Sequence, residues 1–182
     1  MQKIILLFHL FFLSCGFYSL AGSIPPHIRS IAIPLIDNQT AEFGLSEKIT
    51  DGIIEQFNQV GVLMIVDENS AHSILRGSVK QVNDGPFTYS KEESVSEYRF
   101  KIDINVEWYD VSNQKNILKN RYSGFGAYGV SGDISSDGID NDEDGKIDDK
   151  DDDEFGEPRA FATEVAIRKI AEDILNDIMT TW

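Results

Sequence analysis

The sequence predicts an α+β fold: a two-layer sandwich in which two helices cover one face of a mixed sheet of four to five strands. Two segments repeat apolar residues every three or four positions, as amphipathic helices do, and a segment between them alternates apolar and polar residues, as a half-buried strand does. With 182 residues, 41% of them hydrophobic, the chain is long enough for one domain with a sizeable core. Because two helices cover only one face of such a sheet, the other face should be at least partly polar.

The first fourteen residues have the pattern of a secretory signal peptide. Lys3 precedes an apolar run from Ile4 to Leu13, which has the length of a signal-peptide core and roughly half the length that a membrane-spanning helix requires. The next residues, Leu13-Ser14-Cys15-Gly16, resemble the lipobox at which bacterial lipoproteins are cleaved and then acylated on the new amino-terminal cysteine. We therefore expect residues 1–14 to be removed. The alternative is an ordinary secretory peptide with an unrelated cysteine.

On the lipoprotein interpretation, Cys15 carries covalent lipid and residues 15–27 form a short tether to the domain. Several acyl chains supply more than the two signals that stable membrane anchoring takes. Gly16 stands where an Asp would resemble an inner-membrane retention signal, so the outer membrane is the expected location. Residues 28–182 would then form the folded domain.

The predicted elements of the domain begin with a strand. Residues 28–36 are apolar and β-branched, which predicts a strand buried on both faces for much of its length, and Pro34 places this strand at an edge or a bulge. An amphipathic helix ending at Gly61 is predicted next. Its apolar stripe consists of Leu45, Ile49, Ile53, Phe57 and Val60. Residues 62–66 form a second predicted strand.

The second half of the domain contains the clearest pattern in the chain. A third strand is predicted over residues 74–82, with Asp84-Gly85-Pro86 as its stop signal. Residues 98–108 then alternate strictly between apolar and polar, so one face of this strand should lie in a core and the other in water. Residues 116–125 are predicted to pair antiparallel with it. The last element is a helix that begins at Pro158, with a stripe formed by Ala162, Ala166, Ile170, Ile174 and Ile178.

The negative charge of the chain is concentrated in one segment. The chain has 31 acidic and 16 basic residues, a net charge of −15. Residues 133–157 contain thirteen of the acids against only Lys146 and Lys150, so eleven of the fifteen net charges lie there. We therefore interpret residues 133–156 as an acidic insertion, and the overall acidity argues against nucleic acid as a partner. The single Cys excludes an internal disulfide framework and zinc sites built from several cysteines.

Residues suited to nucleophilic catalysis are scarce in the mature chain. A catalytic Ser or Cys needs a base within reach, most often His, and only His27 and His72 remain after cleavage. Both are expected to be solvated loop residues. The glycines of residues 124–129 lack the Lys-Ser/Thr and the βαβ context of a phosphate-binding loop. The sequence therefore predicts a protein that is not an enzyme.

The acidic insertion contains a pattern typical of a twelve-residue calcium loop. It has carboxylates at positions one, three, five, nine and twelve, with a Gly at position six that permits the sharp turn. The expected ligands of Ca²⁺ are Asp140, Asp142, Asp144, the main-chain carbonyl of Lys146, Asp148 and Asp151. Asp at the twelfth position is shorter than the usual Glu, and no amphipathic helix precedes the loop. A solvated acidic linker without an ion is the alternative.

Basic side chains recur at polar positions of the predicted strands. They come in pairs on three successive strands: Arg76 and Lys80, Arg99 and Lys101, and Lys119 and Arg121. Antiparallel neighbours would bring some of these cations within cross-strand distance. One interpretation is a cationic sheet face that receives phosphate groups. The alternative is a set of solubilising residues that pair with Asp103 or Glu107.

The order of these features along the chain resembles the LptE family of lipopolysaccharide-assembly lipoproteins. The features are the lipobox Cys15, the segment Pro25-Pro26-His27-Ile28-Arg29-Ser30-Ile31-Ala32-Ile33-Pro34 leading into Asp37-Asn38-Gln39-Thr40, the helix with Leu45 and Ile49, Val66-Asp67-Glu68, Ile74-Leu75-Arg76-Gly77 and the carboxy-terminal helix. The resemblance covers nearly the whole chain except residues 130–156, where the acidic insertion departs from the family pattern.

The resemblance implies a non-enzymatic outer-membrane lipoprotein that sits inside or against the β-barrel translocon LptD and helps to deliver lipopolysaccharide to the cell surface. Lipid A carries phosphates and acyl chains, so Arg76, Lys80, Arg99, Lys101 and Lys119 are the candidate lipopolysaccharide-binding residues. The opening strand followed by Asp-Asn-Gln-Thr also resembles periplasmic lipoprotein domains of the CsgG and LpoB type. An outer-membrane lipoprotein that activates or scaffolds another envelope machine is therefore the alternative.

Overall fold

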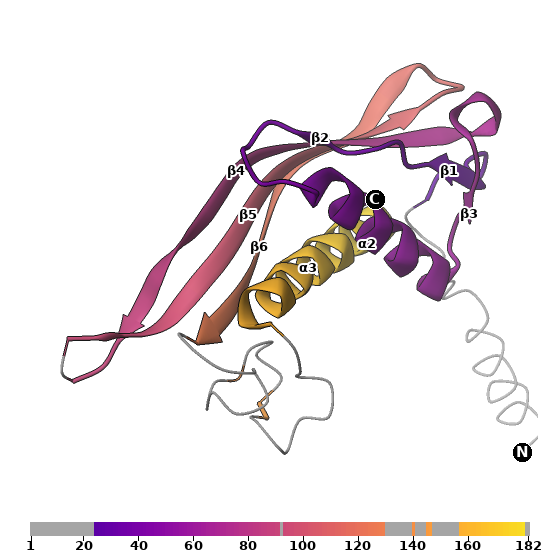
Figure 1. Cartoon of the computed structure of the whole chain (residues 1–182). Helices are drawn as coiled ribbons and strands as arrows, with labels where there is room; N and C mark the ends of the chain where they lie inside the picture. Colours follow the sequence, from indigo (N-terminus) through magenta and orange to yellow (C-terminus); the bar gives the residue numbers. More distant parts are fainter. Residues whose placement is uncertain (1–23, 92, 130–139, 141–144, 147–156, 181–182) are drawn as a thin grey trace, which may run out of the picture.

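A computed structural model of the chain describes residues 24–91, 93–129, 140, 145–146 and 157–180. These residues form a mixed sheet with two helices packed against it (Figure 1). The strands are β1 (Ser30–Ala32), β2 (Asp37–Asn38), β3 (Met64–Ile65), β4 (Ser73–Tyr89), β5 (Val95–Asp110) and β6 (Lys115–Gly129). The helices are α2 (Leu45–Val60) and α3 (Pro158–Thr180), with a short 3-10 helix, η2 (Glu68–Ser70), between β3 and β4.

Three long strands form the body of the sheet. The strand order is β3-β1-β4-β5-β6, and β2 pairs with β4 beyond the end of β1. The long strands β4, β5 and β6 are antiparallel, and the short strands pair in parallel. The predicted antiparallel pairing of the last two strands is confirmed, with Trp108 of β5 opposite Leu118 of β6. The predicted fold class is confirmed as well, with six strands in the described sheet.

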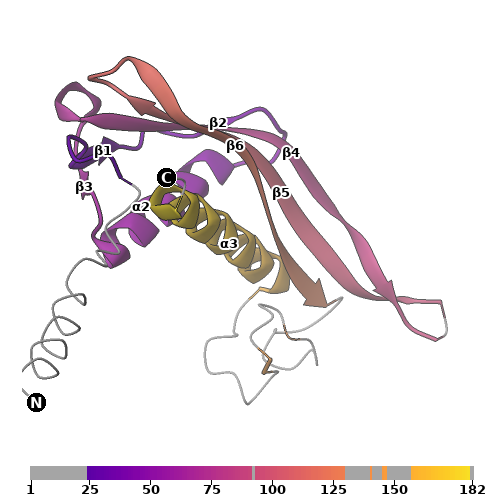
Figure 2. The same cartoon turned by 180° about the vertical axis from the view of Figure 1, so that it is seen from behind.

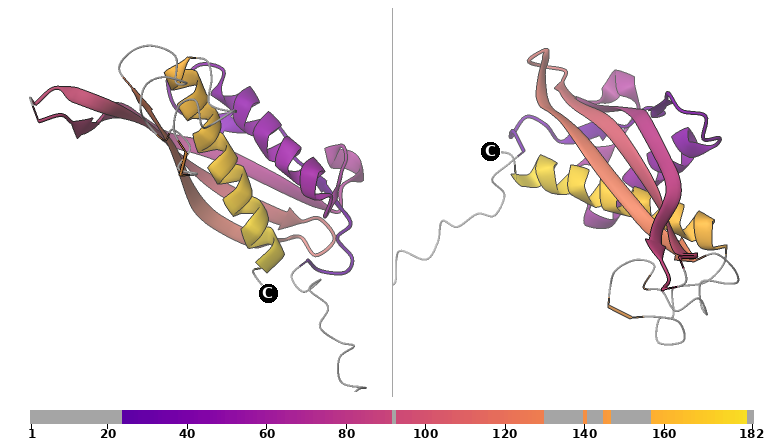
Figure 3. Two further views of the ribbon diagram at one scale, coloured as in Figure 1. Left: turned by 90° about the horizontal axis from the view of Figure 1, so that it is seen from below. Right: turned by 90° about the vertical axis from the view of Figure 1, so that its left-hand side faces the viewer.

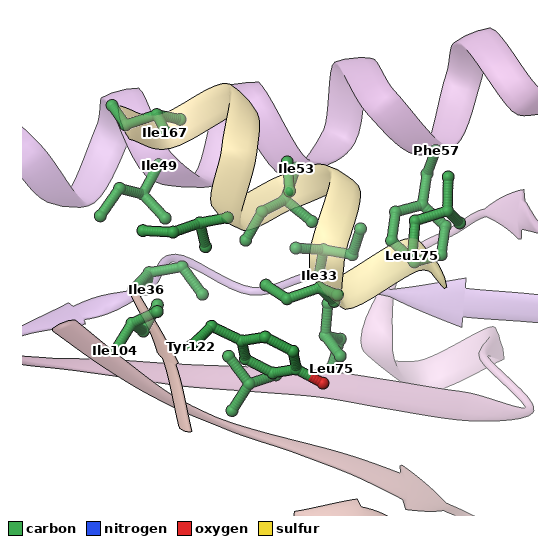
Figure 4. Close-up of a cluster of buried hydrophobic side chains, with 14 of the residues drawn as sticks. Ile33, Ile36, Ile49, Ile53, Phe57, Leu75, Ile104, Tyr122, Ile167 and Leu175 are labelled. Carbon is green, nitrogen blue, oxygen red and sulfur yellow. The ribbon is translucent and has the colours of Figure 1, made fainter. Parts of the chain in front are cut away.

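The core lies between the sheet and the two helices. Phe100, Ile102, Ile104, Val106 and Trp108 of β5 are fully buried, as the period-two pattern predicted. They pack into one apolar cluster with the stripes of α2 and α3, part of which is drawn in Figure 4. Both helices lie on the same side of the sheet (Figures 1 and 3). No described helix covers the opposite face of β4, β5 and β6 (Figure 2), and this face is called the uncovered face below.

Two glycines of β6 allow α3 to approach the sheet closely. A Cβ atom added to Gly124 would lie 2.1 Å from the carbonyl oxygen of Ala166, and one added to Gly126 would lie 2.2 Å from that of Ala162. Only hydrogen atoms fit between these backbones, and Ala162 and Ala166 are the small residues of α3 at the contact. The Gly-Phe-Gly pattern in β6 therefore serves helix-to-sheet packing.

Two predicted strand boundaries are wrong. The first predicted strand, residues 28–36, is interrupted: β1 ends at Ala32, Pro34 lies in an irregular stretch, and β2 begins at Asp37. The second predicted strand is shortened to Met64–Ile65. The split gives the sheet one strand more than the predicted maximum.

The third predicted strand does not stop at Asp84-Gly85-Pro86. Instead β4 continues to Tyr89, with Pro86 opposite Tyr98 of β5. Strand β2 pairs with β4 only at Ser78 and Val79, so the outer edge of β4 at Pro86 has no strand partner among the described residues. The missing N–H of a proline is tolerated at such an edge.

Candidate functional site on the uncovered face of the sheet

The uncovered face carries the six predicted cations, and five of them already have polar partners. Arg76 of β4 and Lys119 of β6 both flank Glu107 of β5 in the strand register. The Nζ atom of Lys119 lies 2.5 Å from Glu107 Oε1, and Arg76 Nη2 donates to Glu68 Oε1 at 3.0 Å. The hydrogen bond from Lys119 lowers the pKa of Glu107 and outweighs the opposing effect of burial. This part of the face is therefore a row of mutually neutralised charges.

A second carboxylate neutralises two more of the cations. Asp103 of β5 is buried, and its carboxylate lies 3.0 Å from Arg121 Nη2 and 3.4 Å from Lys101 Nζ. Burial alone would raise the pKa of Asp103, but hydrogen bonds from Ser123 and Arg121 and the charge of Lys101 lower it overall. Asp103 is consequently ionised at neutral pH and holds both cations.

Lys80 is separated from the other cations by an irregularity in β4. The pairing of β4 with β5 shifts register between Val79 and Gln81, which leaves Lys80 at the bulge. Its Nζ donates to Gln39 Oε1 at 2.9 Å, next to the end of β2. Lys80 therefore has an amide oxygen beside β2 as its partner, away from Glu107 and Asp103.

Arg99 has a different environment from the other five cations. Its guanidinium carbon lies 3.3 Å from the ring centre of Phe87 on β4 and 4.0 Å from that of Phe125 on β6. Its Nε atom is buried and has no hydrogen-bond partner. In the described part of the chain, no carboxylate forms an ion pair with Arg99. Among the six predicted cations, Arg99 is therefore the one without a carboxylate or amide partner in the described part of the chain. The Phe125 ring also has Lys169 Nζ of α3 at 4.8 Å from its centre.

The two aromatic rings were missed by the sequence analysis. Phe87 follows Asp84-Gly85-Pro86, which was interpreted as the end of a strand, so it was placed outside the sheet. Phe125 falls at the end of the predicted last strand, two residues before Ala127, which pairs with Arg99. Only the register of three strands brings both rings to Arg99, and this register is not contained in any local pattern.

The two predicted loop histidines lie at the opposite end of β5 from Arg99. His27 Nε2 lies 2.7 Å from Oδ2 of Asp110, whose side chain is only 1% exposed. Asn113 donates to Asp110 from its main-chain N–H and from its side-chain amide. His72 is exposed, and its Nδ1 accepts from the N–H of Arg29. His27 is thus not simply solvated, because it ties the segment before β1 to the turn after β5.

The predicted lipidation and calcium residues lie largely outside the described residues. Cys15 lies outside the described part of the chain, and so do four residues of the calcium pattern, namely Asp142, Asp144, Asp148 and Asp151. Of the pattern, Asp140 and the pair Gly145 and Lys146 are described. The N–H of Gly145 donates to Asp140 Oδ2 at 2.9 Å, and Gly145 has a φ of +94°. Among the described residues no cluster of three or more His, Cys, Asp or Glu side chains is suited to a metal ion.

Comparison with known proteins identifies the family of the chain. The family model described as LptE, lipopolysaccharide-assembly, matches residues 28–182. The chain therefore belongs to the LptE family, which is a family of non-enzymatic lipoproteins. No curated protein sequence matches the chain.

Two solved structures share the fold at low sequence identity, and a third is similar at a lower TM-score. A protein of Xanthomonas campestris has a TM-score of 0.53 and 10% identity, over 87% of this chain and 91% of that chain. A hypothetical protein of Chlamydia trachomatis has a TM-score of 0.52 and 9% identity, over 85% and 99% of the two chains. The rare lipoprotein B of Shewanella oneidensis has a TM-score of 0.45 and 12% identity, over 82% and 95%. Within the described residues, neither helix is long and apolar enough to cross a membrane.

Proposed function

We propose that this chain is a lipid-anchored outer-membrane component of the lipopolysaccharide transport machinery. In this role it binds lipopolysaccharide and plugs or supports a β-barrel of the LptD type. The observation that carries the proposal is the family match across the whole predicted domain, residues 28–182. No catalytic step is part of the proposal.

The architecture is compatible with both parts of this role. The buried apolar residues of α2, α3 and the sheet form one internal core, which suits a self-contained plug inside or against a barrel. The uncovered face of the sheet offers cations for the phosphates of lipid A, namely Arg76, Lys80, Arg99, Lys101 and Lys119, with Phe87 and Phe125 beside them. Charge and apolar surface together suit an amphiphilic anion.

Anchoring at Cys15 would keep the domain at the inner surface of the outer membrane. The predicted tether of residues 15–27 spans at most about 45 Å when fully extended, at roughly 3.5 Å per residue. The domain would therefore act close to the membrane, where a barrel partner resides.

Purification of the chain from detergent-solubilised outer membranes tests the proposal. The full chain with a carboxy-terminal tag should retain one large β-barrel protein in constant ratio, together with lipopolysaccharide. A second outer-membrane lipoprotein carrying the same tag is the control and should retain neither. Retention of a synthase or a secretion complex in place of the barrel would contradict the proposal and support the alternative of a lipoprotein that activates another envelope machine.

A further inference from the structure

We infer that Arg99, held between Phe87 and Phe125, is the residue of this chain that recognises a phosphate group on an amphiphilic ligand. The inference rests on the proposed function and narrows its five candidate cations to one. On this inference, the other cations of the uncovered face serve as partners of the protein's own carboxylates and amides.

The first argument is the distribution of partners on the face. Lys101 and Arg121 share Asp103, Lys119 is paired with Glu107, Arg76 with Glu68, and Lys80 with an amide oxygen of Gln39. A ligand phosphate has to compete with a carboxylate already in place at four of these five cations. Arg99 has no such competitor in the described part of the chain.

The second argument is the way in which the two rings hold the guanidinium. A planar guanidinium stacks on an aromatic face and still presents its N–H groups at its edge. With Phe87 and Phe125 contributed by the strands on either side of β5, the position of the guanidinium is fixed before any ligand arrives. An Arg edge presented in this way matches two oxygens of a phosphate, which a lysine ammonium does not.

The third argument concerns the chemical class of the ligand. An aromatic pair can bind a ligand's cation, but here the protein's own Arg99 occupies that place, so the site calls for an anion. Apolar surface lies beside the charge: Phe87 is 47% exposed, and Tyr89, two residues further along β4, is 60% exposed. A phosphate attached to acyl chains would use both the cation and this apolar rim.

Calorimetric titration of the full chain in detergent provides the test. Lipid A dispersed in the same detergent is the probe, and enzymatically dephosphorylated lipid A is the comparison. Arg99→Gln should weaken the binding of lipid A by at least about tenfold, the effect of losing a charge-assisted hydrogen bond. Arg99→Lys should weaken it similarly, because the charge remains but the stacked planar edge is lost. Dephosphorylated lipid A should bind the wild type as weakly as lipid A binds Arg99→Gln.

Arg121→Gln is the matched control, since it removes one guanidinium from the same face at a residue paired with Asp103. Its affinity for lipid A should stay within about twofold of the wild type. The inference is overturned if Arg99→Gln binds lipid A normally, if Arg121→Gln loses as much affinity, or if inorganic phosphate competes as well as lipid A at equal phosphate concentration. Thermal unfolding of both variants verifies that the fold is intact.

The outcomes separate this inference from the proposed function. If the chain retains its barrel partner but Arg99→Gln binds lipid A normally, the assignment of Arg99 is wrong and the proposed function stands. If Arg99-dependent binding of lipid A is found but no barrel is retained, the barrel part of the proposed function is wrong and the assignment of Arg99 stands.

Discussion

Arg159 donates one hydrogen bond to each carboxylate oxygen of Glu42, at 3.1 and 3.0 Å. The same guanidinium donates to Asp84 of β4 at 2.6 Å and lies 4.8 Å from the ring centre of Phe100. The hydrogen bonds that Arg159 donates to Glu42 and Asp84 raise the pKa of Arg159. One side chain in the first turn of α3 thus joins the loop before α2, strand β4 and strand β5.

Replacing this guanidinium should cost more stability than replacing an ordinary surface cation. We expect Arg159→Met to lower the free energy of unfolding by about 1–2 kcal/mol, because the carboxylates of Glu42 and Asp84 lose their charged partner. This loss already allows for solvent screening, since the Arg159 side chain is 44% exposed. Arg76→Met, which breaks one exposed pair with Glu68, is the control and should cost less than about 1 kcal/mol. Urea unfolding measures both, and equal losses would contradict a special role for Arg159.

The close contact of β6 with α3 predicts a position that tolerates no side chain. A Cβ atom on Gly126 would lie 2.6 Å from the Cα and 2.2 Å from the carbonyl oxygen of Ala162. We expect Gly126→Ala to lower the free energy of unfolding by about 1–3 kcal/mol or more, since backbone has to move. Gly85→Ala is the control within the same sheet, where the nearest atom is Asn83 Oδ1 at 3.9 Å. Similar urea midpoints for the two variants would show that α3 packs less tightly than described.

The pair of His27 and Asp110 predicts a pH dependence of stability. Burial opposes ionisation of Asp110, but hydrogen bonds from Asn113 and His27 outweigh it and lower its pKa below the ordinary value of 3.8. A carboxyl group with a lowered pKa stabilises the fold above its unfolded pKa, and this stability is lost as the pH falls through the folded value. Asp110→Asn should therefore lower the free energy of unfolding by about 1–3 kcal/mol at pH 7, and the difference from wild type should shrink below about pH 4.

The control for this prediction is Glu55→Gln on the solvent side of α2, where the exposed carboxylate accepts a hydrogen bond from Gln59 at 3.3 Å. The free energy of unfolding of Glu55→Gln should equal that of the wild type both at pH 7 and below about pH 4. A deficit of Asp110→Asn that stays constant from pH 7 to pH 3 would refute the linkage between Asp110 ionisation and folding.

The calcium pattern of residues 140–151 stays a prediction from the sequence. The left-handed Gly145 and its hydrogen bond to Asp140 are compatible with the turn that the sixth position of such a loop needs. We expect calorimetric titration to give a dissociation constant of roughly 10⁻⁴ to 10⁻³ M, the range of extracellular modules. Asp142→Ala combined with Asp144→Ala should abolish the heat. Absence of heat in the wild type would identify the segment as a plain acidic linker.

The sequence predicted the elements whose pattern is local. Strand β5 was predicted correctly because burial of one face imposes period two on its side chains. The apolar residues at alternate positions from Phe100 to Trp108 are buried accordingly. The α2 stripe was found for the same reason at helical spacing, except that Val60, at the end of the helix, is exposed. Both patterns record which face meets the core, and neither requires knowledge of the partner element.

The continuation of β4 past Pro86 was not predictable in this way. Proline is acceptable there because the outer edge of β4 has no described partner at that point, and edge position depends on the whole topology. The setting of Arg99 depends on the same feature, since Phe87 reaches it only if β4 continues. The contact of Arg99 with the two rings therefore depends on strand register. Register is a property of pairs of segments, so local patterns in the sequence do not reveal it.

The central claim is that this chain serves the assembly of lipopolysaccharide. It is tested most directly by depleting the chain in its own cells and measuring the fraction of newly made, pulse-labelled lipopolysaccharide that becomes accessible on the surface of intact cells. The account predicts that this fraction falls sharply before growth stops and is restored by a wild-type copy. An unchanged surface fraction in cells that have lost the protein would contradict it.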